Sequence, residues 1–345
     1  MSKLKYLGTY ISPLLALISF NCTGFFAYSG IIFLYVLVPF LENLIPKNND
    51  NFNKEENNSA KHDWFYNWIL YLLVPFHLYV IYVFLITIAN PALELVDLIG
   101  YVLMMGTILG INGINGGHEL GHKINHPLKM FLARVLLTTS FQNHFITYHN
   151  AGHHRDVATP NDLTTAKKGD IFYFFALKSQ IGGYFKSWRL EAEKIKSKGG
   201  NQLLNPMIIH TIVPWSFLGI IYYFCGAEVT FFYFLAAVFG ISILEAQNYF
   251  SHYGLKRKLK EDGTYERVKV EHSWNSDHVI GRVFLFELTR HSDHHFSGAK
   301  PYQVLKSKEE SPMLPFGYPA MLILSYFPFI FKPVMEKQLA KYGMD

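Results

Sequence analysis

The sequence predicts an all-α integral membrane protein, in which six transmembrane helices form a bundle and histidine-rich helical segments gather on one side. Two observations predict this class. The 345 residues are 50% hydrophobic, and their mean hydropathy of +0.13 is high for a soluble domain of this length. Lys and Arg are also absent from three long stretches, Lys5 to Lys47, Lys61 to Lys123 and Lys198 to Lys256. Each stretch has room for two apolar spans of about 20 residues.

The first stretch predicts a helical hairpin with spans over about residues 6–22 and 27–44. Two lysines precede it, and no small-residue cleavage site stands out. It is therefore predicted to be a signal anchor and first span rather than a cleaved signal peptide. The segment 46–62 is rich in Asn, Lys and Glu, which predicts a solvated connection with a composition typical of disorder.

The other two stretches predict two more hairpins. Their spans cover about residues 67–88, 96–115, 207–225 and 229–249. With the N-terminus in the cytoplasm, the three short outer turns contain no Lys or Arg, and all 31 basic residues fall on the cytoplasmic side. This distribution predicts six spans, with both termini and residues 46–62, 123–205 and 256–345 in the cytoplasm. Because the cations flank membrane spans, the net charge of +5 does not predict binding to nucleic acid.

The two long cytoplasmic parts contain apolar stretches of their own. Residues 130–145 and 171–188 predict helices that lie on the membrane surface or serve in docking. Residues 313–331 are nearly long enough to span, but they contain three prolines, and a seventh span would put the C-terminus outside. An interfacial segment is predicted there, and the whole chain, 1–345, is predicted to form a single domain.

Three histidine boxes carry the main functional signal. His118 and His122 lie in His-Glu-Leu-Gly-His, where the i, i+4 spacing puts both imidazoles on one helix face and lets them reach one metal. His149 and His153 share a face in the same way, and His154 is rotated by about 100°, which predicts a role at a second metal. The third box holds His291, His294 and His295 on one side of a turn, and His252 stands alone at the end of the sixth span.

The predicted topology brings these nine histidines to one face of the membrane. A lone histidine near a membrane surface is usually structural, but three converging boxes favour a metal centre, and nine imidazoles suit two metals better than one. Neutral imidazole binds Zn, Cu, Fe and Ni alike, so ligand type alone does not choose the metal. Ligating imidazoles need a partner for their other N–H group. The candidates beside the boxes are Glu119, His144, Asp156, His272, Asp277, His278 and Asp293.

Two functions from other classes compete with this interpretation. The pattern His118-Glu119-x-x-His122 alone predicts a membrane zinc protease with Glu119 as general base, but it leaves seven histidines unexplained. A metal transporter needs polar groups along the depth of the membrane, whereas these spans are almost free of charge.

The two cysteines, Cys22 and Cys225, cannot build an iron–sulfur or zinc centre.

The boxes and their surroundings resemble the alkane 1-monooxygenase family, the membrane alkane hydroxylases. The similarity extends over roughly residues 60–330, with the motifs in the family's order. The matching segments are HELGHK at 118–123, HNAGHHRDVATP at 149–160, NYFSHYG at 248–254, HSWNSDH at 272–278 and LTRHSDHH at 288–295.

The resemblance implies a six-helix bundle with two iron ions at the cytoplasmic face. It implies O2-dependent hydroxylation of the terminal carbon of medium- or long-chain n-alkanes to primary alcohols, in the bacterial inner membrane. It also implies that electrons come from rubredoxin and rubredoxin reductase. The chain itself lacks a cysteine cluster and a Gly-rich nucleotide loop, so an external reductant is required. The implied ligands are His118, His122, His149, His153, His154, His252, His291, His294 and His295.

One position departs from the family pattern. The family commonly has Glu before the lone histidine, and this chain has Ser251. Related xylene-type monooxygenases also differ there, so hydroxylation of an alkylaromatic methyl group stays an alternative. A fatty-acyl desaturase, which uses similar boxes, is a further alternative that product analysis would separate.

Overall fold

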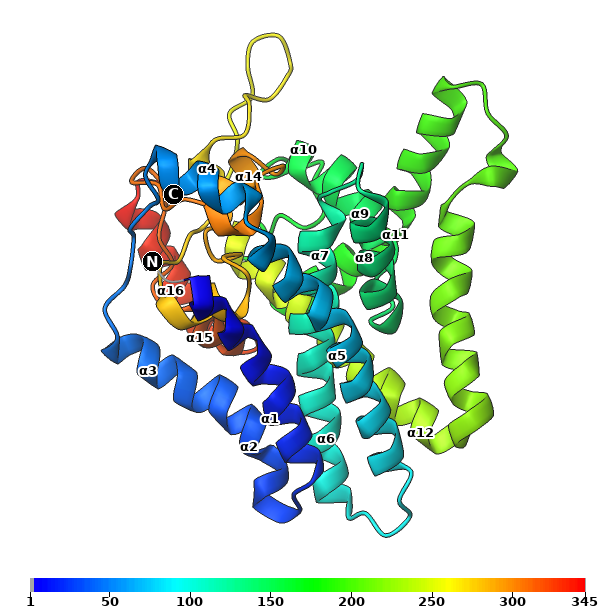
Figure 1. Ribbon diagram of the computed structural model, residues 1–345. Helices are drawn as coiled ribbons and strands as arrows, with labels where there is room; N and C mark the ends of the chain where they lie inside the picture. Colours follow the sequence, from blue (N-terminus) through cyan, green and yellow to red (C-terminus); the bar gives the residue numbers. More distant parts are fainter. Residues whose placement is uncertain (1–2, 345) are drawn as a thin grey trace.

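The computed structural model describes residues 3–344, which form helices joined by turns and loops. The β pairing in this range consists of two isolated bridges, so the predicted all-α class is confirmed. Long helices run side by side through the lower part of the molecule, and shorter helices gather at the upper end, where both termini lie (Figure 1).

The first helical hairpin has one arm made of η1 (Lys3–Tyr10) and α1 (Ile11–Phe20). The returning arm is built from η2 (Gly24–Tyr28), α2 (Ser29–Ile32), the π turn η3 (Phe33–Leu37) and α3 (Val38–Leu44). Gly24 starts the second arm with a φ of 60°, which a side chain would disfavour, and its amide donates to Asp97. That contact ties the turn to the neighbouring helix α6 (Leu95–Ile108).

The connection after this hairpin contains a helix, α4 (Lys54–His62), which corrects the prediction of a disordered-type segment. The Asn53 side chain accepts hydrogen bonds from the Glu55 and Glu56 amides, and the Glu56 side chain accepts from the Asn53 amide. This capping box satisfies the first amides of the helix. The helix forms although its composition is strongly polar.

The second hairpin consists of α5 (Trp64–Ile88) and α6. The helix predicted to end near residue 115 runs further, through the π turn η4 (Leu109–Asn115) into α7 (Gly116–Gly121). His118 therefore lies inside this continuous helical stretch rather than beyond its end.

The third hairpin is the helical stretch α12 (Met207–His252). It bends sharply at Gly226, where φ is 82° and ψ is 178°. The two predicted spans are the two arms on either side of this bend, which lies low in the molecule (Figure 1). Glycine suits this position because its backbone there is far from helical and has a positive φ.

The remaining helices lie mostly at the upper end of the molecule, and all but α11 are short (Figure 1). They are α8 (Pro127–Thr139), α9 (Phe145–Tyr148), η5 (His149–His153), α10 (His154–Asp156), α11 (Phe172–Ser197), η6 (Gln202–Leu204), η7 (Val270–His272), α13 (Val279–Phe284), α14 (His291–Phe296), η8 (Tyr302–Val304), α15 (Tyr318–Ser325) and α16 (Pro328–Lys341). The last apolar stretch is thus divided between α15 and the start of α16.

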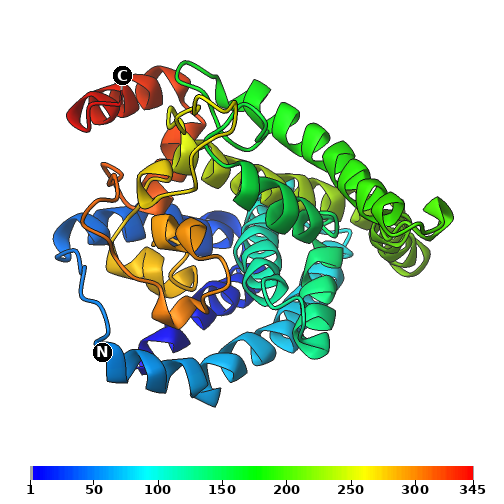
Figure 2. The same ribbon diagram turned by 90° about the horizontal axis from the view of Figure 1, so that it is seen from above.

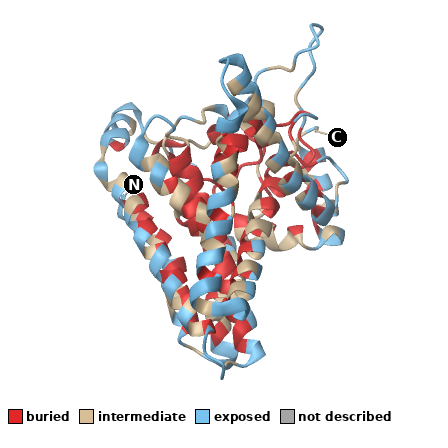
Figure 3. Cartoon of the chain, turned by 90° about the vertical axis from the view of Figure 1, so that its right-hand side faces the viewer, coloured by how far each residue is buried: buried red, intermediate tan, exposed pale blue. Residues whose placement is uncertain are grey.

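Four helical stretches are long and apolar enough to cross a membrane, residues 24–44, 64–88, 95–121 and 202–252. Large apolar side chains cover their outward faces, as Leu72, Tyr82 and Ile86 do on α5, each more than half exposed. Figure 3 shows this exposed surface along the long helices, with buried residues on the inside. A contiguous apolar surface of this kind suits contact with lipid rather than water.

The long helices pack closely through small residues. A Cβ on Gly106 of α6 would lie 2.6 Å from the Ala236 carbonyl oxygen, and one on Gly240 of α12 would lie 2.8 Å from the Gly106 carbonyl oxygen. Glycines let two helix backbones approach where side chains would hold them apart. This crossing fixes the second arm of α12, which ends at His252, against α6, which leads to His118.

Candidate metal centre

Four separate helical segments bring the histidine boxes together at the upper end of the bundle. The boxes lie at the end of the α6–α7 helix, on η5 and α10, at the end of α12, and on α14. Seen from above, the segment carrying α14 is surrounded by helices from distant parts of the chain (Figure 2). The convergence predicted from topology is confirmed by the ring contacts between all of these boxes.

The first group of histidines consists of His118, His122, His149 and His294. The Nε2 atom of His118 lies 3.0 Å from that of His149, 3.0 Å from that of His122 and 3.1 Å from that of His294. His149 and His122 are separated by 3.2 Å at the same atoms. All four imidazoles thus direct Nε2 at one point.

Hydrogen bonds between imidazoles do not explain this arrangement. A neutral imidazole nitrogen has either one N–H or one lone pair, so the Nε2 atom of His118 cannot satisfy three nitrogens at once. A metal with N ligands at about 2.0–2.1 Å, spaced 90–110° apart, separates neighbouring nitrogens by about 2.9–3.4 Å. The observed separations match the edges of such a coordination polyhedron.

The second group consists of His153, His252, His291 and His295, all buried. The Nε2 atom of His291 lies 3.1 Å from that of His252 and 3.1 Å from that of His295. The Nε2 atom of His153 is buried and has no hydrogen-bond partner among residues 3–344. It is therefore available as a ligand, and the structure offers two separate four-histidine sites.

The division of the boxes differs from the sequence prediction. The i, i+4 spacing predicted that His149 and His153 share one helix face, but they belong to different groups, and residues 149–153 form a π turn rather than an α-helical turn. The π turn inserts an extra residue and changes which side chains are aligned. The third box is also divided, with His294 in the first group and His291 and His295 in the second.

His154 lies outside both four-histidine groups but between them. Its Nε2 atom is 2.9 Å from that of His149, and its ring stacks on His295 at 4.5 Å between centroids. Gly298 makes room for it, because a Cβ there would lie 2.9 Å from the His154 Cε1 atom. His154 therefore contacts a member of each group.

Burial keeps these imidazoles neutral, which is the form that binds metal. The pKa of each imidazole named below lies well under its usual value. Burial is the largest cause of this shift, and neighbouring histidines add to it. The six imidazoles outside the candidate membrane helices that behave in this way are His122, His149, His154, His291, His294 and His295.

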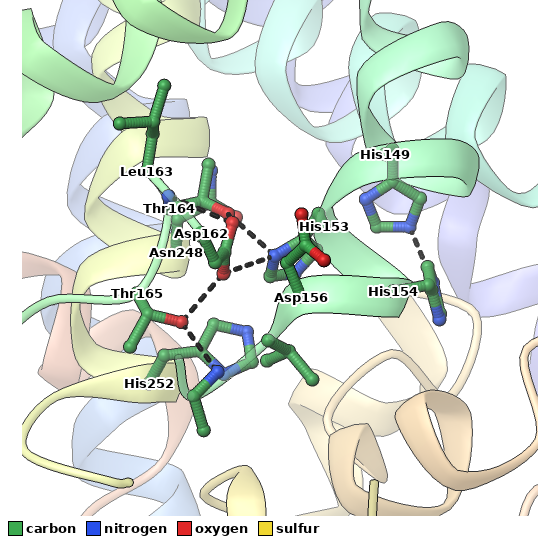
Figure 4. A network of polar contacts seen from close by, with 12 residues as sticks. His149, His153, His154, Asp156, Asp162, Leu163, Thr164, Thr165, Asn248 and His252 are labelled. Carbon is green, nitrogen blue, oxygen red and sulfur yellow. Dashed lines mark hydrogen bonds and ion pairs between the residues drawn. The ribbon is translucent and has the colours of Figure 1, made fainter. Parts of the chain in front are cut away.

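Asp162 is a functional candidate that sequence analysis missed (Figure 4). Its Oδ2 atom lies 2.8 Å from His153 Nδ1, and Tyr148, Thr164 and Thr165 donate hydroxyl hydrogen bonds to the carboxylate. Burial alone would raise the pKa of Asp162, but His153 and the hydrogen bond from Thr165 hold it below its usual range. An ionised carboxylate that accepts the Nδ1–H bond presents Nε2 of His153 to a metal.

Asp293 and Asp277 lie beside the third box and stabilise its loops. Asp293 is fully buried on α14 and accepts hydrogen bonds from the Lys300 ammonium group, at 2.7 Å, and from the Lys306 amide. Asp277 accepts from the Ser307 hydroxyl and lies 3.8 Å from Arg290. Both carboxylates therefore connect the loop after α14 to the box.

The side chains of the other predicted supporting residues contact groups other than the box histidines. Asp156 pairs with Arg155 and Lys186 at the surface, and His272 lies 3.4 Å from Glu266. The Nδ1 atom of His278 lies 2.9 Å from the Ser276 hydroxyl. His144 is buried with its ring edge-on to Tyr184.

Glu119 does not occupy the position that a zinc protease requires. Its carboxylate accepts a hydrogen bond from the Tyr302 amide at 3.2 Å and is buried. It thus anchors the loop after α14 to α7. Because His118 and His122 share their site with two further histidines, the pair is not the open three-ligand site of a catalytic zinc enzyme.

An apolar cavity of about 90 Å³ reaches the histidines from within the bundle. One histidine of the second group, His291, and two of the first, His118 and His149, form part of its wall. The rest of the lining is mostly apolar and comes from the returning arm of the first hairpin, η4, the second arm of α12, α13 and α15. The site therefore combines a metal-binding end with a space for an apolar molecule.

Comparison with known proteins identifies the family. The alkane 1-monooxygenase 1 of Alcanivorax borkumensis is 32% identical to this chain over 96% of the chain and 83% of that protein. The alkane 1-monooxygenase of Ectopseudomonas oleovorans shares 32% identity over the same proportions. This chain belongs to the alkane 1-monooxygenase family.

Two further comparisons show similarity to proteins outside the alkane 1-monooxygenase family. The sequence profile of the fatty acid desaturase family matches residues 92–324, which contain all nine box histidines. The hydroxylase component of a xylene/toluene monooxygenase from Pseudomonas putida is 25% identical over 79% of this chain and 75% of that protein. At the departure from the family pattern, Ser251 is buried, with its hydroxyl 3.3 Å from Tyr318 and 3.1 Å from the Gln247 amide nitrogen.

Proposed function

We propose that this chain is a membrane monooxygenase that uses O2 to hydroxylate the terminal carbon of medium- or long-chain n-alkanes to primary alcohols. The observation that carries the proposal is the pair of buried four-histidine sites beside an apolar cavity. Relatives named alkane 1-monooxygenase support it over nearly the full chain.

The proposed metals are two iron ions, and the proposed ligands are the nine box histidines. His118, His122, His149 and His294 would hold one ion, and His153, His252, His291 and His295 the other, with His154 between them. The neutral, buried imidazoles suit a divalent transition metal. When bound, the irons supply the activation of O2 and the oxidation of an unreactive C–H bond.

The protein's own residues position the substrate and exclude water. Leu34, Ile111 and Phe284 are among the apolar side chains of the cavity wall, so an alkyl chain there packs against apolar groups. The alkane would enter from the lipid between helices and end at His118, His149 and His291. A terminal methyl is the part of a linear chain that reaches the end of a narrow cavity first, which accounts for attack at a primary carbon.

The membrane arrangement is proposed to have six spans, with both termini and the metal centre in the cytoplasm. The bend at Gly226 supports counting the two arms of α12 separately. The first arm of the first hairpin, made of η1 and α1, packs against α5 and α6 and would be the first span. The absence of Lys and Arg in the three outer turns supports the cytoplasmic side, and the family supports the bacterial inner membrane.

The electrons are proposed to come from rubredoxin, supplied by rubredoxin reductase. Beside the second box lies an open cleft of about 840 Å³ with three basic residues, Arg155, Lys186 and Arg189, in its lining. Its lining residue Arg155 follows His154, the histidine that contacts both groups, in the sequence. A small acidic carrier would be attracted to such a surface.

A second candidate function is hydroxylation of the methyl group of an alkylaromatic compound. The similarity to the xylene/toluene monooxygenase component supports it. Aromatic side chains in the cavity wall, such as Tyr35, Phe145 and Phe250, would pack against a substrate ring.

The deciding experiment combines metal analysis with product analysis. The protein, purified in detergent, receives O2, rubredoxin, its reductase, NADH and octane, and bound metals are measured in the same preparation. Two irons per chain with 1-octanol as product are expected. Iron with a benzylic alcohol from xylene but no octanol would favour the second candidate, an alkene would favour a desaturase, and zinc alone would overturn the oxygenase.

A further inference from the structure

A second, polar cavity lies against the histidine centre. Its volume of about 20 Å³ has room for about one water molecule. It is lined by His149 of the first group and His153 of the second. The other polar lining residues are Gln142, His144, Tyr148, Thr164, Ser179, Gln180, Glu245 and Asn248. This composition contrasts with the apolar cavity, although the two share part of one wall.

Glu245 places a carboxyl group in the wall of this cavity. It lies on the second arm of α12 and is only 3% exposed. Its Oε2 atom accepts a hydrogen bond of 3.4 Å from the Asn248 amide group. Glu245 is a member of none of the ion pairs found among residues 3–344. An ionisable group placed in a membrane helix without a charged partner is costly, and such groups commonly serve proton transfer.

The cavity also contains a buried donor that lacks a protein partner. The Gln142 Nε2 atom has no hydrogen-bond partner among the described residues, and Gln142 is 1% exposed. Buried polar groups are almost always hydrogen bonded. A water in the cavity would satisfy this amide, and the same water would lie next to Glu245 and the two histidines.

Two side chains belong to the walls of both this cavity and a neighbouring open groove. His144 and Gln180 line the polar cavity and also a groove of about 470 Å³ along α11 and α12, whose other lining residues are mostly apolar. The hydroxyl groups of Tyr184 and Thr211, which lie 2.8 Å apart, are part of the groove wall. His144 and Gln180 are therefore polar groups placed between the groove and the cavity that holds Glu245.

We propose that this polar passage delivers protons to the metal centre and that Glu245 relays them. The inference rests on the proposed function, in which one alkane, one O2, two electrons and two protons give one alcohol and one water. The carboxyl group gives one proton to water beside His149 and His153 and takes one from the groove side, so it is unchanged after each transfer. Alkane and protons then reach the centre by separate routes.

Infrared spectroscopy of the metal-loaded protein in lipid nanodiscs tests the passage without turnover. On transfer from H2O to D2O, the C=O band of a protonated carboxyl shifts as its proton exchanges. We expect one exchanging band to be lost in Glu245→Gln and its exchange to be slowed in Gln180→Leu, which blocks the junction with the groove. Glu42, a buried carboxyl bonded to the Gly281 amide, is the matched control, and its band, identified with Glu42→Gln, should be unaffected by Gln180→Leu.

Turnover tests the relay itself. With reductant and alkane, Glu245→Gln should form alcohol about 100-fold more slowly, the lower end of the effect of a general acid, and release hydrogen peroxide instead. Its bound iron should stay at the wild-type level. Wild-type alcohol yield per O2 in Glu245→Gln, or wild-type exchange in Gln180→Leu, would overturn the relay.

The two proposals fail in different ways. If the wild-type protein makes no alcohol but the infrared exchange behaves as expected, the passage stands and the alkane substrate is wrong. If Glu245→Gln does not fold, Gln180→Leu still decides the question, because it keeps the carboxyl group in place.

Discussion

Single residues around the centre divide into ligands and groups that orient them. The sequence indicates the ligands well, because metal-binding histidines occur at helical spacings within short boxes. It does not indicate Asp162, which follows His153 by nine positions and reaches it through a loop. Asp156 stands closer to the box and was the obvious choice, yet it pairs with Arg155 and Lys186. Proximity along the chain is a poor guide to contacts made by loop residues.

Asp162→Asn should weaken metal binding without unfolding the protein. The amide cannot accept a charged hydrogen bond from His153 and can turn its NH2 group toward Nδ1, which would favour the wrong tautomer. Loss of such an orienting carboxylate typically costs about 10–100-fold in metal affinity or activity, and we expect a loss of this size in the affinity for iron. Iron content after dialysis against a graded chelator series measures it, with Asp156→Asn as the surface control. Equal retention of iron in both variants and the wild type would contradict the role of Asp162.

At the scale of elements, two π turns decide where the boxes point. η4 precedes His118, and η5 contains His149 and His153. The length of the apolar stretches without Lys or Arg predicted the long helices themselves, since apolar stretches of this length have few alternatives in a membrane. It could not predict a π turn, because the extra residue changes the direction of side chains without changing composition. For this reason the spacing of His149 and His153 did not show that they belong to different groups.

The crossing of α6 and α12 at Gly106 and Gly240 should tolerate no side chain. Gly240→Ala places a methyl group 2.8 Å from the Gly106 carbonyl oxygen and 3.1 Å from the Gly110 amide nitrogen, both backbone atoms that cannot move independently. We expect a loss of about 1–3 kcal/mol in the free energy of unfolding, the usual effect of overpacking. Gly219→Ala on the same helix, where a Cβ meets nothing within 4 Å, is the matched control. Thermal unfolding in detergent compares the two, and equal midpoints would contradict the packing argument.

A buried ion cluster fastens η1 to the loop that leads into the third box. Glu287 is 1% exposed, and its carboxylate lies 2.6 Å from Arg282 and 2.9 Å from Lys5, and also accepts the Tyr6 hydroxyl. Burial alone would raise the pKa of Glu287, but Arg282, Lys5 and Arg290 lower it to about 2, from an ordinary value of 4.5. The ionised carboxylate therefore stabilises the folded state above its unfolded-state pKa.

This stabilisation should be lost as the pH falls from about 4.5 through about 2, because the unfolded chain binds the proton more readily. Glu287→Gln removes the charge and leaves buried cations unpaired, at a cost of about 3–5 kcal/mol at neutral pH. Unfolding midpoints measured across this pH range should converge for the two proteins at the acidic end. A constant difference between them at every pH would show that the charge of Glu287 is not the cause.

At the scale of the whole molecule, the histidine centre is the meeting point of three kinds of surface. Apolar helix faces and the apolar cavity lead to it from the membrane side, the polar cavity, which Glu245 lines, adjoins it, and the basic cleft begins at Arg155, directly after the second box. The sequence predicted the all-helical class and the convergence of the boxes. It could not predict the cavities, because their walls combine residues from helices far apart in the chain.

The basic cleft gives the last prediction, which concerns the electron carrier. Arg189 is exposed on α11 and lines the cleft, away from the histidines in sequence. Arg189→Glu should raise the KM for rubredoxin and leave kcat at saturating carrier unchanged, because a rim charge acts on association rather than on chemistry. The effect should shrink as salt is added, since exposed charges are screened over about 10 Å at 0.1 M ionic strength. Lys337→Glu, an exposed charge change on α16, is the control with the same change in net charge. If both variants raise KM equally, the carrier responds to overall charge and the cleft is not its docking surface; if only Arg189→Glu does so, the cleft lies in the path by which electrons reach the centre.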